Sequence, residues 1–173
     1  MLTHVDSDIW EMDDLRDQTL AHSDPSSGTG NLTPRALYEE RFDIVPGEDY
    51  DVEWSGSHDA SILGVYHEDY DAAPTTSIIV ERLARQGEFD PDDIRVIFSS
   101  QVFPMGPFCY RYNLHPDIIE GIRAAHLDYD YRDTQVYEDM NFDEFVEIDY
   151  ATHWDDMLLV HEANDVEYDL DEL

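Results

Sequence analysis

The stretch from Gln18 to Arg41 reads QTLAHSDPSSGTGNLTPRALYEER and indicates a strand, a loop and a helix in succession. Its first residues, Gln18–His22, are a candidate β-strand, and the following SDPSSGTGN is rich in turn-forming residues. Thr33 and Pro34 then predict a helix start, with Thr33 as the N-cap and Pro34 at the first helical position. We expect this helix to run to about Arg41. Units of this kind are the building blocks of α/β folds.

The same order of strand and helix recurs in the residues that follow. Tyr50–Trp54 predicts a strand, and a helix begins near Ser57. Asp71–Pro74 predicts a shorter strand, which leads into a helix from about Thr76 that Gly87 ends. Strands that alternate with helices are typical of a mainly parallel sheet covered by helices.

The most strand-like run of the chain is Ile94–Ser99, IRVIFS, which is typical of a parallel strand buried on both faces. Phe108–Tyr112 predicts a further strand, and Pro116–Leu127 predicts a helix. A last helix is expected at about Trp154–Ala163, whereas the stretch from Tyr129 onward otherwise shows no clean period. The sequence therefore predicts an α/β fold.

The charge of the protein is extremely negative, with 42 acidic residues against 9 basic ones and a formal net charge of -33. The basic residues are all Arg, the acids are spread along the whole chain, and 42% of the residues are hydrophobic. This distribution favours a folded protein with a halophilic, acidic surface over a disordered acidic tail. It argues against nucleic acid and anionic membranes as partners, because the sequence shows no cluster of basic residues that could bind them.

The sequence shows no apolar run of the roughly 18 residues that a transmembrane helix needs, and its N-terminus lacks the features of a signal peptide. As written, the chain would therefore stay in the cytoplasm. Its single cysteine, Cys109, excludes an internal disulfide. Because Cys109 lies between two aromatic residues of a predicted strand, we expect it to be a core residue rather than a nucleophile.

The segment Ser23–Leu37, SDPSSGTGNLTPRAL, has the composition of an anion site. Its Ser, Thr and Gly residues bring hydroxyls and backbone N–H groups to a helix start, where the helix dipole favours negative charge. Loops of this kind are also common as simple turns, so the pattern by itself leaves both interpretations open. It is not a nucleotide P-loop, because that motif needs a Lys and the chain contains none.

Four segments, in this order, resemble the phosphonate, phosphite and phosphate solute-binding proteins of ABC transporters. They are SDPSSGTGNLTPRAL, WSGSHDASIL, DAAPTTSIIVERL and IRVIFSSQVFPMGPFCYRYNLHPDIIEGI. The resemblance runs from about Asp6 to the C-terminus. It implies the type II periplasmic-binding-protein fold, with residues 1–106 as one α/β lobe. Residues 107–173 would be the return segment and C-terminal helices of an incomplete first lobe.

The function that the resemblance implies is the solute-binding component of a transporter, in truncated form. Its partners would be a small oxyanion and the membrane permease, and no cofactor is expected. Because the return segment would lack sheet partners, residues 113–173 are expected to be less securely packed than Gln18–Ser100.

The resemblance also implies a set of ligand-binding residues. The family's Ser-Thr-Ser anion loop falls on residues 27–29, where Gly28 loses a hydroxyl while the backbone donors remain. The family's pocket histidine falls on His58, at a helix start, where an imidazole can donate a hydrogen bond to an anion. Hydroxyls after Asp71–Pro74 stand where the family can carry acids that recognise a ligand amino group, which favours phosphate or phosphite. The expected ligand-binding residues are Ser27, Gly28, Thr29, His58, Thr75 and Thr76.

Other interpretations are less well supported. A metal cluster of His58, His67, Asp69 and Asp71 would lack the short ligand spacing of known sites. An enzyme is not expected, because no nucleophile and base stand at a recognisable spacing.

The alternative function is a non-binding remnant or a split subunit with a structural or interaction role. A regulatory effector domain would require a DNA-binding segment, and none is present.

Overall fold

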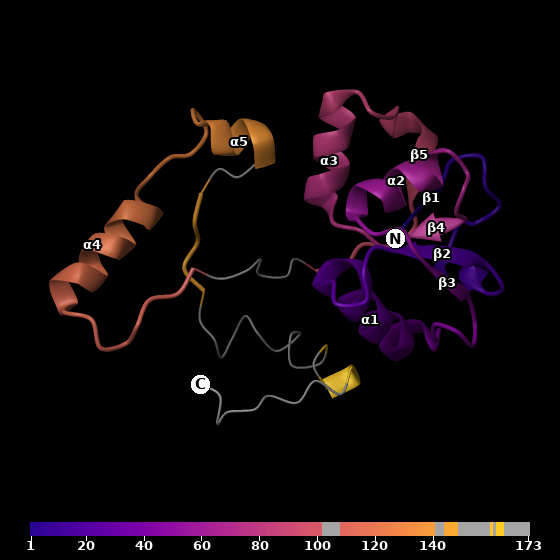
Figure 1. Ribbon diagram of the computed structural model, residues 1–173, viewed down its shortest axis with the longest axis horizontal. Helices are drawn as coiled ribbons and strands as arrows, with labels where there is room; N and C mark the ends of the chain where they lie inside the picture. The colour runs from indigo at the N-terminus through magenta and orange to yellow at the C-terminus, as the bar shows by residue number, and fades with distance from the viewer. Residues whose placement is uncertain (102–107, 141–143, 149–159, 161, 165–173) are drawn as a thin grey trace. The chain divides into compact units, whose positions relative to one another are not determined.

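The computed structural model describes residues 1–101, 108–140, 144–148, 160 and 162–164 (Figure 1). The chain forms two compact units. One is built from Met1–Gln101 and Met157–Leu173, and the other from Val102–Asp156. The first unit contains the sheet and all the residues that the sequence singles out as ligand-binding.

Five strands form the sheet of the first unit: β1 Leu2–His4, β2 Thr19–His22, β3 Asp51–Trp54, β4 Ala72–Ala73 and β5 Ile94–Val96. Their order across the sheet is β3-β2-β4-β1-β5. β2 pairs in parallel with β3 and β4, whereas β1 pairs in an antiparallel manner with β4 and β5. Four of these described strands therefore run in one direction and β1 runs in the other. The mixed, mainly parallel sheet that the sequence predicts is confirmed.

Helices α1 Thr33–Phe42, α2 His58–Tyr66 and α3 Ser77–Gln86 cover this sheet. Figure 1 shows α1 on one side of the strands and α2 and α3 on the other. Successive residues of a strand point to opposite faces, and Ala21 of β2 packs against Val65 of α2. A second cluster on this side joins α2 and α3 to β1, through Leu2, Ile62, Leu83 and Phe89.

Local signals set two of the helix boundaries as the sequence predicts. The Ser57 hydroxyl caps α2, because its Oγ accepts a hydrogen bond from the backbone N–H of Ala60 at 3.1 Å. Gly87 ends α3 in the left-handed conformation, with φ of 74°, which glycine adopts without steric cost. The structure thus confirms the predicted helix start near Ser57 and the predicted end at Gly87.

The start of α1 differs from the prediction. Thr33 is not the N-cap, because the chain already winds helically through a π-helical turn, η2, over Gly28–Leu32. Thr33 has helical dihedrals, φ of -64° and ψ of -49°, whereas an N-cap residue is extended. Ser27 caps the turn instead, and its Oγ accepts a hydrogen bond from the backbone N–H of Gly30 at 3.1 Å. The helical N-terminus therefore reaches into the Ser/Gly/Thr loop itself.

The environment of β5 also differs from the prediction. The strand is shorter than Ile94–Ser99 and lies at the edge of the sheet, where the side chain of Val96 is 57% exposed. The expected burial on both faces is wrong because β1, which the sequence did not predict, lies between β4 and β5. β5 thus pairs only with an antiparallel neighbour among the described strands.

The second unit contains α4 Pro116–Leu127, which confirms the predicted helix, and α5 Gln135–Met140, which was not predicted. Residues 108–112 are exposed and form no strand, so the predicted strand and the predicted burial of Cys109 are both wrong. Alternating aromatic residues fit a strand, but a strand forms only where a neighbour shares its hydrogen bonds. The helix expected at Trp154–Ala163 lies mostly outside the described residues.

The described helices also bear on membrane insertion. None in this part of the chain combines the length and the apolar character that crossing a bilayer requires.

Candidate functional site

The candidate site lies where three parallel strands end. β2, β3 and β4 run in the same direction, so the segments that follow them meet at one edge of the sheet. After β2 comes the loop that contains η2, after β3 the turn into α2, and after β4 the segment Pro74–Thr76 that leads into α3. The sequence places its candidate ligand-binding residues on these three segments.

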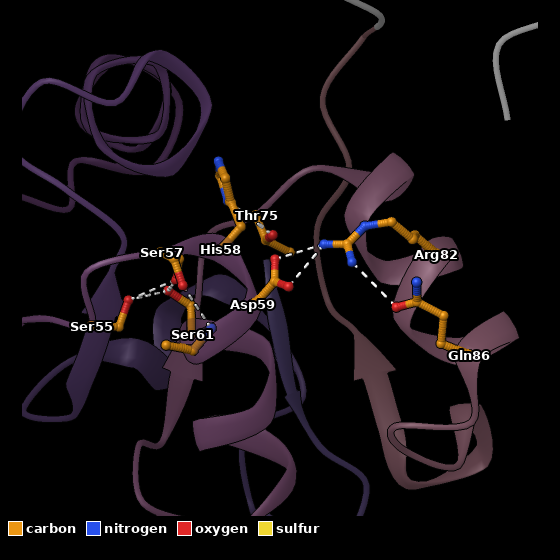
Figure 2. A network of polar contacts seen from close by, with 9 residues as sticks. Ser55, Ser57, His58, Asp59, Ser61, Thr75, Arg82 and Gln86 are labelled. Atoms are coloured by element: carbon orange, nitrogen blue, oxygen red, sulfur yellow. Dashed lines mark hydrogen bonds and ion pairs between the residues drawn. The ribbon is translucent and has the colours of Figure 1, made fainter. Parts of the chain in front are cut away.

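His58 joins the three segments through its ring. The Oγ1 atom of Thr29 lies 3.1 Å from Nε2 of His58, and the Oγ1 atom of Thr75 lies 3.1 Å from Nδ1 of His58. Figure 2 shows the His58 side chain rising from the start of α2, with Thr75 close to it. In a neutral imidazole one nitrogen donates and the other accepts, whereas protonation makes both nitrogens donors. Each hydroxyl can serve either role.

The protonation state of His58 follows from its surroundings. Burial of the half-buried ring lowers the pKa of His58 below its usual value, and the nearby Asp59 carboxylate partly opposes this shift. The imidazole is therefore neutral at neutral pH in the structure as it stands. An anion placed beside the ring would raise the pKa of His58 again, because opposite charge favours the protonated form.

The other predicted residues have distinct places in the same region. Gly28 and Thr29 are the first residues of η2, where backbone N–H groups have no intrahelical acceptor. A Cβ added at Gly28 would meet no atom within 4 Å, so this position faces open space. The Ser27 hydroxyl caps η2. Thr76 precedes the first residue of α3 and makes no side-chain cap hydrogen bond there.

Gly30 allows a close contact between the loop and the end of β2. A Cβ at Gly30 would lie 1.8 Å from Oγ and 2.8 Å from Cβ of Ser23, so only glycine fits without a shift. The Ser23 hydroxyl is buried, and among the described residues it has no hydrogen-bond partner. Neither residue is among those expected from the sequence to bind a ligand.

A buried polar network lies beneath the loop and was missed from the sequence. Asn31 Nδ2 donates to the carbonyl oxygen of Pro25 at 2.7 Å, so the amide oxygen of Asn31 must accept from Nδ1 of His22, at 2.9 Å. Nε2 of His22 then accepts from the Tyr50 hydroxyl, at 3.1 Å. The network ties the loop to β2 and to the start of β3, and no spacing signal in the sequence links its members.

The state of His22 also follows from burial. The ring is fully buried and stacks on the Tyr50 ring, with a centroid distance of 5.8 Å. Burial lowers the pKa of His22 to about 4; the Asn31 hydrogen bond opposes this shift, and Arg35 adds to it. His22 is therefore a neutral, structural histidine, in contrast to the half-buried His58 of the same region.

Serine hydroxyls hold the turn that carries His58. The Ser55 hydroxyl lies 2.6 Å from that of Ser61, and the Ser61 hydroxyl donates to the carbonyl oxygen of Ser57 at 3.1 Å (Figure 2). Gly56 between them has φ of 87°, which favours glycine. The SGS turn is thereby fixed, and His58 is held at the first position of α2.

Comparisons with known proteins agree on one group of relatives. A family model described as "ABC transporter, phosphonate, periplasmic substrate-binding protein" matches residues 1–154. The phosphonates-binding periplasmic protein of Escherichia coli (strain K12) is 25% identical over 118 residues, which are 66% of this chain and 35% of that protein.

Two solved structures share the fold. A binding protein component of an ABC phosphonate transporter from Pseudomonas aeruginosa has a TM-score of 0.68 and 22% identity, over 94% of this chain and 55% of that one. A protein from Prochlorococcus marinus in complex with methylphosphonate has a TM-score of 0.66 and 13% identity, over 95% of this chain and 65% of that one. The chain thus spans between about a third and two thirds of the length of these relatives. The expected fold class, one lobe of a periplasmic binding protein, is confirmed.

Proposed function

Because the chain belongs to the periplasmic substrate-binding proteins of phosphonate ABC transporters, we propose that it binds a phosphorus oxyanion: a phosphonate, phosphite or phosphate. The observation that carries this proposal is the convergence of Thr29, His58 and Thr75 from three separate segments onto one imidazole. The proposed role is binding rather than catalysis, since the family is one of substrate-binding proteins and the group offers several donors for an anion.

The donors of this group suit a tetrahedral anion. The backbone N–H groups at the start of η2 and the hydroxyls of Thr29 and Thr75 can each donate to an oxygen. His58 can donate from one nitrogen when neutral and from both when protonated. Ser27 and Thr76 flank the group and add hydroxyls. An anion among these donors has its charge shared among several short hydrogen bonds.

The ligand is proposed to be small. The segment after β4 offers the hydroxyls of Thr75 and Thr76 and no carboxylate, so it holds no partner for an ammonium group on a ligand. Methylphosphonate is bound in the protein from Prochlorococcus marinus. For this chain we extend the proposal to methylphosphonate, phosphite and phosphate as the first ligands to test.

The net charge of -33 opposes the binding of any anion. We propose that the protein works in concentrated salt, where the Debye length shrinks to about 3 Å near 1 M and distant carboxylates are screened. Donors at contact distance keep most of their effect under these conditions. The acidic surface and the anion site are then compatible.

The transport role is proposed at the level of the family. Two-lobed binding proteins close around their ligand by hinge motion. In this proposal the described site forms one wall of the binding cleft, a second lobe forms the other, and the loaded protein docks to the membrane permease. A split subunit that supplies only this wall is the alternative that a negative binding result would favour.

Thermal unfolding in concentrated KCl, with and without ligand, tests the proposal. At a ligand concentration of 100 times Kd, stabilisation is about 2.7 kcal/mol, and Tm rises by roughly 5 to 10 °C. Phosphate, phosphite and methylphosphonate are compared with sulfate. His58→Ala should abolish the shift, whereas His67→Ala, at the other end of α2, should retain it. A shift no larger than that of sulfate would contradict the proposal.

A further inference from the structure

Beside His58, the structure holds an acidic residue whose charge is paired. Asp59 is the second residue of α2, and its carboxylate contacts Arg82 of α3. One guanidinium nitrogen of Arg82 lies 2.7 Å from Oδ1 and 2.9 Å from Oδ2 of Asp59. Figure 2 shows the carboxylate turned toward Arg82 and the His58 ring turned to a different side.

Arg82 is itself held in place by its surroundings. Its second terminal nitrogen donates to Oε1 of Gln86, one helical turn further along α3, at 3.2 Å. The next residue, Leu83, is 3% exposed and packs in the same core cluster as Ile62 of α2. The side chain of Arg82 is 26% exposed and that of Asp59 46% exposed, so bulk water screens the pair only in part. The ion pair therefore joins two helices that are already packed together.

An unpaired Asp59 would conflict with an anion site. A carboxylate in the first turn of a helix interacts with the same positive end of the dipole that favours a bound oxyanion. It would repel an oxyanion held by His58 and the start of η2, and it would attract an ammonium group on a ligand. The influence of Asp59 reaches His58, because its carboxylate raises the pKa of that ring against the effect of burial.

We propose that Arg82 determines which ligand charge the site accepts. By pairing with Asp59, Arg82 removes the one negative charge adjacent to His58 in sequence, so that simple oxyanions are favoured over zwitterionic aminoalkylphosphonates. Arg82 acts through Asp59 and does not itself contact the ligand. This inference rests on the proposed function of the site as an oxyanion binder.

Charge-changing variants separate this role from a purely structural one. Arg82→Gln leaves Asp59 unpaired, Asp59→Asn removes the carboxylate, and the double variant removes both charges. Arg85→Gln is the matched control, because Arg85 is exposed on the same helix and the substitution changes the net charge equally. Calorimetry gives Kd for methylphosphonate and for 2-aminoethylphosphonate, at about 0.3 M and about 3 M KCl, where the Debye lengths differ roughly threefold.

The expected pattern has four parts. Arg82→Gln weakens methylphosphonate binding by about fivefold at the lower salt and by less at the higher salt. The same variant weakens 2-aminoethylphosphonate by less than about twofold, since the freed carboxylate attracts the ammonium group. The double variant returns methylphosphonate affinity to within about twofold of wild type, because no unpaired charge remains. Arg85→Gln leaves both affinities unchanged.

Two results would overturn the inference. If Arg82→Gln weakened both ligands equally, or if the double variant stayed as weak as the single one, Arg82 would be only a tether between α2 and α3. A failure of the proposed function would give a different result, because the wild-type protein would then bind neither ligand. That result would also overturn the inference about Arg82.

Discussion

The hydroxyl oxygen of Thr29 lies 3.1 Å from Nε2 of His58, although the loop and the helix that carry the two residues are separated by α1 and β3. The parallel pairing of β2 with β3 brings the two segments together at one edge of the sheet. Thr75, after β4, lies at the same distance from the other ring nitrogen.

Thr29→Val and Thr75→Val should each weaken the binding of methylphosphonate or phosphate. Valine keeps the shape of threonine and removes only the hydroxyl, so the loss is about 1 kcal/mol, or about fivefold in Kd. Ligand titration by calorimetry measures it, with circular dichroism as the test of folding. Thr134→Val, in the second unit, is the control. Unchanged affinity in both site variants would show that these hydroxyls do not contact the ligand.

Gly28→Ser should tighten oxyanion binding by about two- to fivefold, because it adds a hydroxyl at the start of η2. The position has room, since a Cβ there meets no atom within 4 Å. Gly28→Ala is the matched control, because it adds the Cβ without the hydroxyl. Equal affinities of the Ser and Ala variants would mean that the ligand does not reach this residue.

Gly30→Ala should lower the free energy of unfolding by about 1 to 3 kcal/mol, because its Cβ would collide with Ser23. Urea unfolding in concentrated KCl measures the change. The comparison is Gly28→Ala, two residues away on the same loop, which should stay within about 0.5 kcal/mol of wild type. Similar losses in the two variants would show that the close contact of Gly30 with Ser23 is not a packing constraint.

His22 should make the protein sensitive to mild acid. Its pKa is lowered to about 4 by burial, against an ordinary value near 6.5. Between these two pKa values the unfolded chain binds a proton at His22 and the folded chain does not. The contribution of His22 to the free energy of unfolding is therefore fully present above pH 6.5 and is lost as the pH falls toward 4. The loss approaches about 3 kcal/mol. Carboxylate titration is common to wild type and His22→Gln, so the difference in their unfolding free energies isolates this histidine. A difference that is independent of pH would contradict the assignment.

Hydrogen exchange should be slower in the first unit than in α4. Four residues of α2 are buried, including Ile62 and Val65, whereas α4 has none. Amides of α4 should therefore exchange through local opening at low free energy. Mass spectrometry of peptides from Thr19–Tyr66 and from Pro116–Leu127 gives the comparison. Equal protection in both would refute the expectation that the C-terminal part is less securely packed.

Much of the fold was predictable because its signals are local. The helix at Pro116–Leu127 and the end of α3 at Gly87 follow from proline, glycine and apolar spacing over a few residues. The strand at Asp51–Trp54 lies within the predicted Tyr50–Trp54. The prediction of Thr33 as the N-cap was wrong because the Thr-Pro pair is also compatible with a position inside a helical turn. Only the backbone conformation of the preceding residues, which already form η2, shows that the helical segment begins earlier.

The residues of the candidate group were named from the sequence, but their contacts with one another were not. Motifs pointed to the loop around Thr29, to His58 and to Thr75, and the structure brings these three together. The pairing of Asp59 with Arg82 was not predicted, because an ion pair between two helices produces no regular spacing pattern in the sequence.

By itself, the sequence determined the type of most elements of the first unit, the net charge of -33 and the hydroxyl-rich composition of the loop, because propensity, capping and charge are read from short stretches of chain. The tertiary structure alone decided that β1 separates β4 from β5, that His22, Asn31 and Tyr50 share one buried network, and that Asp59 is paired. These features depend on which distant segments meet. A hydrogen bond or an ion pair forms only where the sheet and the packed helices have already placed both partners within reach.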